Sequence, residues 1–228
     1  MKQLNVLVAC EESQRVCIAF RELGHNAYSC DIQEPSGDHP EWHIHGDATA
    51  VLRGGQIETM DGKIHNISKW DLIIAHPPCT YLSNAGARHL YKEHKLNEER
   101  CNKGIKAKDF FMKFFSADCE HIAVENPIPS KVFQLPTYNQ TIQPYEYGHP
   151  FTKKTCLWLK NLPLLKPTNI VIAERTFCPS GSYSGKHNEK HRGVFTKDRA
   201  RMRSKTFEGI AKAMAEQWSE YLTNEGEQ

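Results

Sequence analysis

The amino-acid sequence predicts an α/β fold in which helices cover both faces of a mostly parallel sheet. Two observations carry this prediction. Short runs of continuously apolar residues, typical of strands buried on both faces, alternate with longer segments whose apolar residues recur at helical spacing. The 228 residues, 39% of them hydrophobic, are also enough chain for one large domain with a buried core.

The expected elements follow one another without an internal repeat. Strands are expected at residues 4–9, 26–31, 71–75, 121–124 and 155–159, and helices at 13–23, 97–115 and 206–222. Gly24 follows the first helix, where a C-terminal glycine cap belongs, and the second strand ends in Asp31. Because strand-like and helix-like segments alternate, we expect the strands to run mostly parallel.

The net charge of +2 hides a strongly basic segment. Residues 151–205 carry 13 Lys and Arg against 3 Asp and Glu, whereas residues 1–150 carry 15 against 19. Within this segment, residues 176–200 are rich in Gly, Ser, His and basic residues, as in a loop-like insertion. A basic segment in a mildly acidic chain indicates a polyanionic partner, with a solvated basic surface as the alternative.

The composition argues against two classes of protein. No apolar run reaches about 18 residues, so we expect no membrane span. The first residues form a short strand followed by the polar EESQR, which is unlike a secretory signal. The eight cysteines are scattered without a C-x-x-C pair, so we expect reduced thiols in a cytoplasmic protein.

Chemically versatile residues follow the expected strands, at the edge where open α/β sheets bind ligands. They are Cys10, Glu11 and Glu12 after the first strand, Asp31 at the end of the second, the loop residue Asp47, His76-Pro77-Pro78-Cys79 after the third and Glu125-Asn126-Pro127 after the fourth. An acid that ends the second strand is suited to accept hydrogen bonds from the ribose of a nucleoside cofactor. A solvated acid at a strand end would have the same pattern.

Cys79 is the candidate nucleophile. Two prolines fix the backbone before it, and a thiol on a rigid turn attacks once its pKa is lowered. Glu125 also follows a strand directly, so we expect it to face the same cleft, where a partly buried glutamate can stay protonated and donate a hydrogen bond. A lone cysteine is more often an inert buried residue, and only the pairing with Glu125 favours a catalytic role.

Three motifs together resemble the cytosine-C5 methyltransferases, in particular the short versions carried by bacteriophages and prophages. They are strand–PPC at Cys79, strand–ENP at Glu125 and Tyr-Gly-x-Pro at residues 147–150, and the resemblance covers residues 4–160 and 200–222. It implies a Rossmann-like methyltransferase fold, S-adenosylmethionine as the cofactor and double-stranded DNA as the partner, with the target base flipped out. It also implies a cytoplasmic protein of a bacterial host, encoded by a phage or prophage, with a role in restriction-modification.

The resemblance implies roles for individual residues. The Cys79 thiolate adds to cytosine C6, Glu125 binds N3 and the exocyclic amine, and Lys153 takes the place of a catalytic arginine. The implied cofactor-binding residues are Cys10, Glu11, Glu12, Asp31, Ile32, Asp47, Ala48 and Pro77. The implied substrate-binding residues are Pro78, Ser83, Asn84, Asn126, Pro127, Lys154 and Arg203, with residues 83–88 as a loop that closes over the flipped base. Residues 1–165 and 201–228 would form the catalytic domain, and 166–200 a reduced, basic target-recognition insert.

The sequence departs from the family pattern in three places. The first loop, residues 9–14, has no glycine, although glycine there lets the backbone approach the cofactor closely. Lys153 and Thr155 stand where the family has two arginines, so the planar guanidinium fork is missing. Only about 40 residues separate Lys160 from Arg201, too few for a rigid surface that reads base edges. We therefore expect weak or very short sequence specificity.

Several alternatives stay open. The fold could act on an RNA cytosine or on an exocyclic amine, or it could be a catalytically inactive nucleic-acid-binding or anti-restriction module. We expect no resident metal, although Cys178, His187 and His191, with Cys156, or His43 and His45, have spacings that zinc could use. Tyr81, Trp158 and Trp218 are expected to pack in the core or against helices rather than to stack on bases. The oligomeric state is not predicted.

Overall fold

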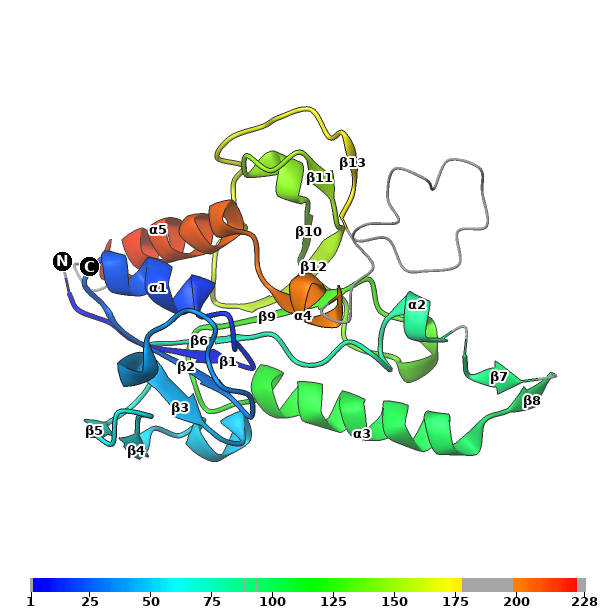
Figure 1. Ribbon diagram of the computed structural model, residues 1–228, viewed down its shortest axis with the longest axis horizontal. Coiled ribbons are helices and arrows are strands. Elements are labelled where there is room, and N and C mark those ends of the chain that lie inside the picture. Colours follow the sequence, from blue (N-terminus) through cyan, green and yellow to red (C-terminus); the bar gives the residue numbers. More distant parts are fainter. Residues whose placement is uncertain (1, 88, 93, 178–198, 225–228) are drawn as a thin grey trace.

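The centre of the structure is a seven-stranded sheet with the strand order β10-β12-β9-β6-β1-β2-β3 (Figure 1). The computed structural model describes residues 2–87, 89–92, 94–177 and 199–224. The strands are β1 (Asn5–Ala9), β2 (Asn26–Asp31), β3 (His43–His45), β6 (Leu72–Ala75), β9 (Ile122–Pro127), β10 (Gln140–Ile142) and β12 (Thr155–Lys160). All five expected strands are therefore present, with ends that differ by no more than three residues.

The pairing of the strands confirms a mostly parallel sheet. β3, β2, β1, β6 and β9 pair in parallel, but β12 is antiparallel to both of its neighbours, β9 and β10. The sheet is thus mostly parallel, as expected, with antiparallel pairing on both sides of β12. A parallel neighbour requires a crossover, usually through a helix. The chain between β9 and β12, which the structure describes throughout, holds β10, the two-residue β11 and short 3-10 turns, but no crossover helix. Strand β12 therefore runs opposite to β9.

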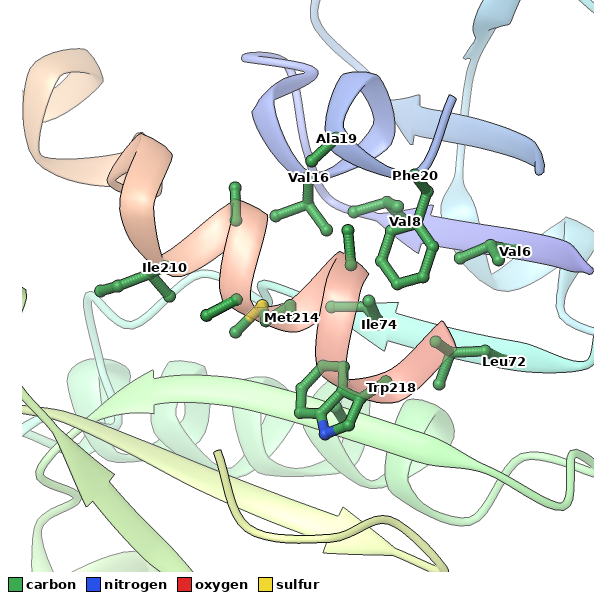
Figure 2. Close-up of a cluster of buried hydrophobic side chains, with 14 of the residues drawn as sticks. Val6, Val8, Val16, Ala19, Phe20, Leu72, Ile74, Ile210, Met214 and Trp218 are labelled. Carbon is green, nitrogen blue, oxygen red and sulfur yellow. The ribbon is translucent and has the colours of Figure 1, made fainter. Parts of the chain in front are cut away.

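Helices cover both faces of the sheet, as expected. Helices α1 (Arg15–Glu22) and α5 (Glu208–Asn224) lie on one face and α3 (Glu98–Phe115) on the other (Figure 1). Alternate residues of β1 and β6 point to the two sides, because side chains alternate along a strand. Val6, Val8, Leu72 and Ile74 pack against α1 and α5 (Figure 2), whereas Leu7, Ala9, Ile73 and Ala75 pack against α3.

Both halves of this core contain large, fully buried side chains. Phe20 and Trp218 lie in the first and Phe111 and Trp158 in the second, each with none of its surface exposed. Burial of a side chain of this size stabilises the fold by roughly 2–3 kcal/mol. The expectation that Trp158 and Trp218 are core residues is confirmed. Tyr81 is instead half-buried under the guanidinium of Arg100, 5.0 Å from its ring centroid.

The helix ends follow local sequence signals. The side chain of Asn97 accepts a hydrogen bond from the backbone N–H of Arg100, 3.0 Å away, and so caps the start of α3. Gly24 ends the α1 region with φ +83°, a left-handed conformation that favours glycine. The last helix, expected at 206–222, begins and ends two residues later.

The elements that the sequence did not predict are short. The strand pairs are β4 (Gly55–Glu58) with β5 (Ile64–Ile67), β7 (Tyr91–Lys92) with β8 (Lys95–Leu96) and β11 (Phe151–Thr152) with β13 (Arg175–Thr176). The short helices are α2 (Asn84–Ala87) and α4 (Arg199–Ser204), and the 3-10 turns are η1 (Pro40–Trp42), η2 (Ala48–Val51), η3 (Lys131–Phe133) and η4 (Pro144–Glu146). Segments of two to six residues are too short for their periodicity to be recognised.

Two expectations about the whole chain are met within the described residues. The seven cysteines among them are free thiols. Across the described part of the chain, no helix has the length and apolar character needed to cross a membrane. Most of the expected insert, residues 178–198 with Cys178, His187 and His191, lies outside the described residues.

Candidate active site

The register of the sheet brings three of the predicted segments to one edge. Ala9, Ala75 and Val124 lie side by side in β1, β6 and β9. The next residue of each strand is therefore Cys10, His76 or Glu125, and the backbone N–H of His76 donates to the Ala9 carbonyl at 2.9 Å. This row is the carboxyl edge of the parallel strands, where ligands bind in open α/β sheets.

The first loop adopts left-handed backbone conformations without glycine. Cys10 has φ +58° and Gln14 has φ +57°, which costs an L-residue roughly 1–2 kcal/mol. The fully buried Gln14 side chain compensates for this cost. It donates to Ser29 Oγ at 3.1 Å and to the His39 carbonyl at 2.9 Å, and it accepts from the His39 N–H at 3.1 Å. The missing glycines thus did not prevent the turn.

The two glutamates of this loop point into the protein. The Glu11 carboxylate accepts hydrogen bonds from the N–H groups of Val16 at 2.7 Å and Cys17 at 3.2 Å, and so caps α1. Burial raises the pKa of Glu11 to about 7, although the charge of His76 and these hydrogen bonds oppose the rise. Glu12 is 5% exposed and pairs with Arg201 at 3.2 Å.

Asp31 and Asp47 converge beside this loop. The Asp31 carbonyl accepts from the Gly46 N–H at 2.9 Å, which ties the end of β2 to the loop after β3. Asp47 is exposed and caps η2 by accepting from the Thr49 N–H at 2.9 Å. Burial, and then the charges of Asp31 and Asp47, raise the pKa of the Cys10 thiol, so both carboxylates lie within electrostatic range of it.

This acidic corner has the properties that an adenosyl sulfonium cofactor requires. Two carboxylates offer hydrogen-bond acceptors and negative charge to a cation, and Ile32, 73% exposed, offers an apolar surface beside them. The predicted residues Ala48 and Pro77 are buried at the same edge. The corner therefore fits S-adenosylmethionine, with Asp31 and Asp47 as the residues that would hold it.

Cys79 is half-buried after Pro77, which is buried, and Pro78, which is exposed. Burial and the charge of Glu125 raise the pKa of the thiol, whereas Lys153 and Arg203 lower it, and the net direction is upward. The thiolate is the nucleophilic form of cysteine. Lys153 and Arg203 favour this form but do not outweigh burial and Glu125 in the protein alone. Cys79, Glu125, Lys153 and Arg203 nevertheless lie close enough to act on one another.

The pKa of Glu125 is lowered, which favours its ionised form over the protonated form that a partly buried glutamate can adopt. Burial raises its pKa, but the hydrogen bond and charge of His76, the charge of Lys153 and a contribution from Thr155 more than offset this, and the pKa is lowered. Glu125 Oε2 lies 3.2 Å from His76 Nδ1, and the side chains are 17% and 6% exposed. The positive groups around this carboxyl thus outweigh its desolvation.

Two distant segments supply the positive charge at Cys79. The ammonium of Lys153 donates to the backbone carbonyl of Arg203 at 2.7 Å, which fixes β11–β12 against α4. The predicted second arginine position holds Thr155, whose own hydroxyl donates to the Lys153 carbonyl at 3.2 Å. The guanidinium near Cys79 comes instead from Arg203. Lys154 is exposed, and its charge acts on Cys156 rather than on Cys79.

The segment around α4 closes over the first loop. Besides the Glu12–Arg201 pair, Arg15 donates to the Thr206 carbonyl at 2.7 Å and Lys205 donates to Ser36 Oγ at 2.8 Å. Residues about 190 positions apart therefore meet at this edge. The resemblance predicted Arg203 as a site residue, but nothing in the sequence indicated a role for Arg201. Arg201 and Glu12 are far apart in the sequence, and only the fold brings their side chains together.

The loop after Cys79 is anchored on both sides. Asn84 N–H donates to the Ile128 carbonyl at 3.1 Å, and Ser83 pairs with Pro129. Arg100 donates to the Gly86 carbonyl at 3.0 Å. A Cβ atom on Gly86 would lie 2.2 Å from the Thr80 carbonyl oxygen. A glycine is therefore required here, because the two backbone segments approach each other closely.

The remaining predicted residues surround the same turn. Asn126 donates to the Pro77 carbonyl at 2.9 Å, which joins the PPC and ENP motifs, and Pro127 is half-buried beside it. The Asn126 Oδ1 atom is buried and has no hydrogen-bond partner among the described residues. It is available to a donor of a bound substrate.

The histidines expected as alternative zinc ligands bind other groups. His43 hydrogen-bonds to Ser29 and to the Gln33 carbonyl, and His45 to the Ile32 carbonyl. Within the ranges that the structure describes, no group of three or more His, Cys, Asp or Glu side chains is arranged to hold a metal ion.

No family model matches the chain, and none of the curated proteins does. Solved structures with similarity include a protein described as a DNA modification methyltransferase encoded within a prophage (E. coli), with 11% identity and a TM-score of 0.38 over 75% of this chain and 52% of that one. A second is the Entamoeba histolytica methyltransferase EhMeth, with 12% identity and a TM-score of 0.37 over 78% of this chain and 58% of that one. A third is the S. pombe Dnmt2 methyltransferase, with 13% identity and a TM-score of 0.36 over 69% of this chain and 49% of that one. The chain spans about half the length of these structures, and they assign it to no family.

Proposed function

We propose that this protein is an S-adenosylmethionine-dependent methyltransferase that methylates C5 of cytosine in DNA, with Cys79 as the nucleophile. One observation carries the proposal. The Cys79 thiol stands on a Pro-Pro turn at the carboxyl edge of the sheet, within electrostatic range of the Glu125 carboxylate, Lys153 and Arg203. A thiol, an acid and two cations at one turn are the groups that addition to a pyrimidine ring requires.

The target base is held by Glu125 and its neighbours. Cytosine presents an exocyclic amine and, when N3 is protonated, a second N–H donor on the same edge. The ionised Glu125 carboxylate accepts from both, and protonation at N3 makes C6 electrophilic. Asn126 Oδ1, buried without a partner among the described residues, offers one more acceptor.

Cys79 forms and later breaks the covalent bond. The thiol first loses its proton to water, which in turn supplies the proton that N3 takes up, and Lys153 and Arg203 favour the resulting thiolate, as their effect on the pKa indicates. The sulfur adds to C6, and electron density moves to C5, which becomes nucleophilic. Asp31 and Asp47 would hold S-adenosylmethionine, which would supply the methyl group to C5 and leave as S-adenosylhomocysteine. Loss of the C5 proton to a base then expels the Cys79 thiolate and restores the ring.

Basic residues support a nucleic-acid partner. The exposed Lys154 and Arg201 and the half-buried Arg203 lie in the segment that carries 13 basic against 3 acidic residues. Such residues bind phosphates on either side of a base that has left the duplex, a step that costs a few kcal/mol. The segment between β12 and α4 is short, so we propose recognition of a very short sequence.

Covalent trapping tests the proposal. The protein is incubated with S-adenosylmethionine and a duplex that contains 5-fluorocytosine, in which the C5 substituent cannot leave as a cation. We expect a protein–DNA adduct that survives denaturing electrophoresis and is absent in Cys79→Ser. Cys101→Ser, which changes another half-buried free cysteine in α3, is the matched control and keeps the adduct.

Two outcomes would contradict the proposal. A wild-type protein that forms no adduct with DNA, as in Cys79→Ser, would exclude C5 chemistry on DNA. An adduct with 5-fluorocytosine RNA alone would transfer the same chemistry to RNA.

A further inference from the structure

His76 has an unusual position for a residue that the motif does not require. Its side chain is 6% exposed, Nδ1 lies 3.2 Å from Glu125 Oε2, and Nε2 is buried without a hydrogen-bond partner in the described part of the chain. A buried imidazole nitrogen without a hydrogen-bond partner destabilises the folded protein. An unsatisfied buried polar group in a folded protein calls for an explanation, and a functional role is one of them.

The sheet register explains why His76 faces Glu125. Ala75 and Val124 are paired, so His76 and Glu125 are the next residues of neighbouring strands. Ile74 and Ala123, two positions earlier, both pack in the core half that lies under α1. Because side chains alternate along a strand, His76 and Glu125 point to this same face.

A second carboxylate, that of Glu11 in the loop before α1, lies within electrostatic range of His76. Glu11 caps the first turn of this helix, and the positive charge of His76 opposes the rise of the Glu11 pKa. Glu11 belongs to the loop of residues 10–14, which the proposed function assigns to the cofactor, and Glu125 to the segment that it assigns to the base. His76 thus lies within electrostatic range of both.

Other groups in range act on the two carboxylates. They are Arg15 and Cys17 on the side of Glu11, and Lys153, Cys79 and Thr155 on the side of Glu125. Thr155 is neutral and the two thiols are protonated at neutral pH, so Arg15 and Lys153 are the cations among them. Each carboxylate therefore has a cation in range besides His76.

We propose that His76 is a positioning residue of this site, whose imidazolium holds Glu125 Oε2 and thereby orients the carboxylate toward the target base. The inference rests on the proposed function, because it assigns a role to the partner of Glu125. His76 acts through Glu125 and does not touch the base itself. Because histidine can change its charge where asparagine cannot, a pH profile separates this contact from a purely structural role.

Two substitutions separate orientation from charge. Asparagine places an N–H donor near the position of Nδ1 but cannot become a cation, whereas alanine removes the contact. In the trapping reaction we expect His76→Ala to form the adduct about 10- to 100-fold more slowly, as for loss of a charge-assisted hydrogen bond. His76→Asn keeps part of the rate and keeps the pH dependence that the Cys79 thiol imposes. We expect the ratio of its rate to that of the wild type to change between pH 5.5 and 8, because only the wild type can change its charge at position 76.

The matched control is His65→Asn in the β4–β5 hairpin, which contacts Thr59 and Tyr28 outside the site and keeps the wild-type pH profile. Thermal unfolding of each variant shows that it is folded. A His76→Asn profile that follows the wild type would overturn the proposal.

A measurement without catalysis separates this inference from the proposed function. The Hε1 resonance of His76, identified by its absence in His76→Asn, is titrated by NMR in the wild type, Glu125→Gln and Glu11→Gln. We expect the midpoint to move to lower pH in Glu125→Gln, because the imidazolium loses an anionic partner. An unchanged midpoint in both variants would refute the contact. If the wild type forms no adduct but the midpoint moves, only the proposed function fails.

Discussion

The thiols of Cys10 and Cys79 stand at the carboxyl ends of the neighbouring strands β1 and β6, yet their surroundings differ in charge. Around Cys10, burial and the carboxylates of Asp31 and Asp47 all raise the thiol pKa. Around Cys79, burial and Glu125 raise it, but Lys153 and Arg203 oppose them. Position at the end of a strand therefore does not make a nucleophile. Cations in range of the sulfur, which Cys79 has, oppose the rise of the thiol pKa and favour the thiolate.

The surroundings of the two thiols also suit different parts of the proposed reaction. We call them the corner of Cys10, with Asp31 and Asp47, and the corner of Cys79, with Lys153 and Arg203. The corner of Cys10 is acidic and suits a cationic cofactor, whereas the corner of Cys79 gathers positive charge and suits an electron-rich intermediate. His76 lies between the two and is within range of an acid from each. Substitutions at the corner of Cys79 should therefore change the rate of adduct formation, and substitutions at the corner of Cys10 should change the stability of the protein.

The largest effect is expected when the cations at Cys79 are removed. Lys153→Gln and Arg203→Gln should each raise the Cys79 pKa further and slow adduct formation about 10-fold. The double variant should slow it roughly 100-fold or more, since each cation stabilises the thiolate by about the energy of a charge-assisted contact. Adduct formation is measured across pH, and the pH at which the rate levels off should move upward.

Lys212→Gln is the matched control for this prediction. It removes an exposed lysine of α5 that pairs with Glu216 on the surface, and it should leave the rate unchanged. A double variant with the wild-type pH dependence would show that the thiol is activated by the bound substrate and not by these side chains.

The next effect concerns stability at the corner of Cys10. Burial raises the pKa of Glu11 from 4.5 to about 7, so between these pH values the folded protein binds more protons at Glu11 than the unfolded chain. Stability from this group is therefore present below about pH 4.5 and is lost as the pH rises to 7, by about 3 kcal/mol in total.

The Glu11→Gln variant tests this pH dependence. Glutamine does not ionise, so the free energy of unfolding, measured in urea from pH 5 to 8, should fall less with pH in the variant than in the wild type. The difference between the two curves isolates Glu11 from the buried histidines, which act in the opposite direction. Parallel curves would show that the Glu11 carboxylate is already ionised in the folded protein at pH 5.

The sequence predicted the fold better than the charges of the site. Buried strands such as 26–31 and helices such as 97–115 carry strong periodic signals, and their positions are confirmed. β3 and β10 are three residues long and carry no such signal. A mostly parallel sheet was expected and is confirmed, but the sequence did not indicate which strand is antiparallel, because the direction of β12 depends on the connection before it and not on the residues within it.

Site residues were predicted where they follow a strand, and missed where the fold joins distant segments. Cys79 and Glu125 could be placed together because parallel strands end at one edge. His76 was visible in the motif, but its contact with Glu125 depends on the register of β6 and β9. The lowered pKa of Glu125 could not be predicted either, since it results from His76, Lys153 and Thr155 acting together against burial.

The smallest effect is expected for the backbone of the first loop. Cys10→Gly relieves a left-handed conformation that costs an L-residue roughly 1–2 kcal/mol, but it removes a half-buried side chain packed against the α3 side of the core, at a cost of about 1 kcal/mol. The two effects nearly cancel, so the free energy of unfolding should change by less than about 1 kcal/mol. Gln14→Gly relieves the same strain but deletes three buried hydrogen bonds, and it should destabilise the protein. If Cys10→Gly were the more harmful of the two, packing of the thiol rather than the Gln14 network would hold this glycine-free loop in place.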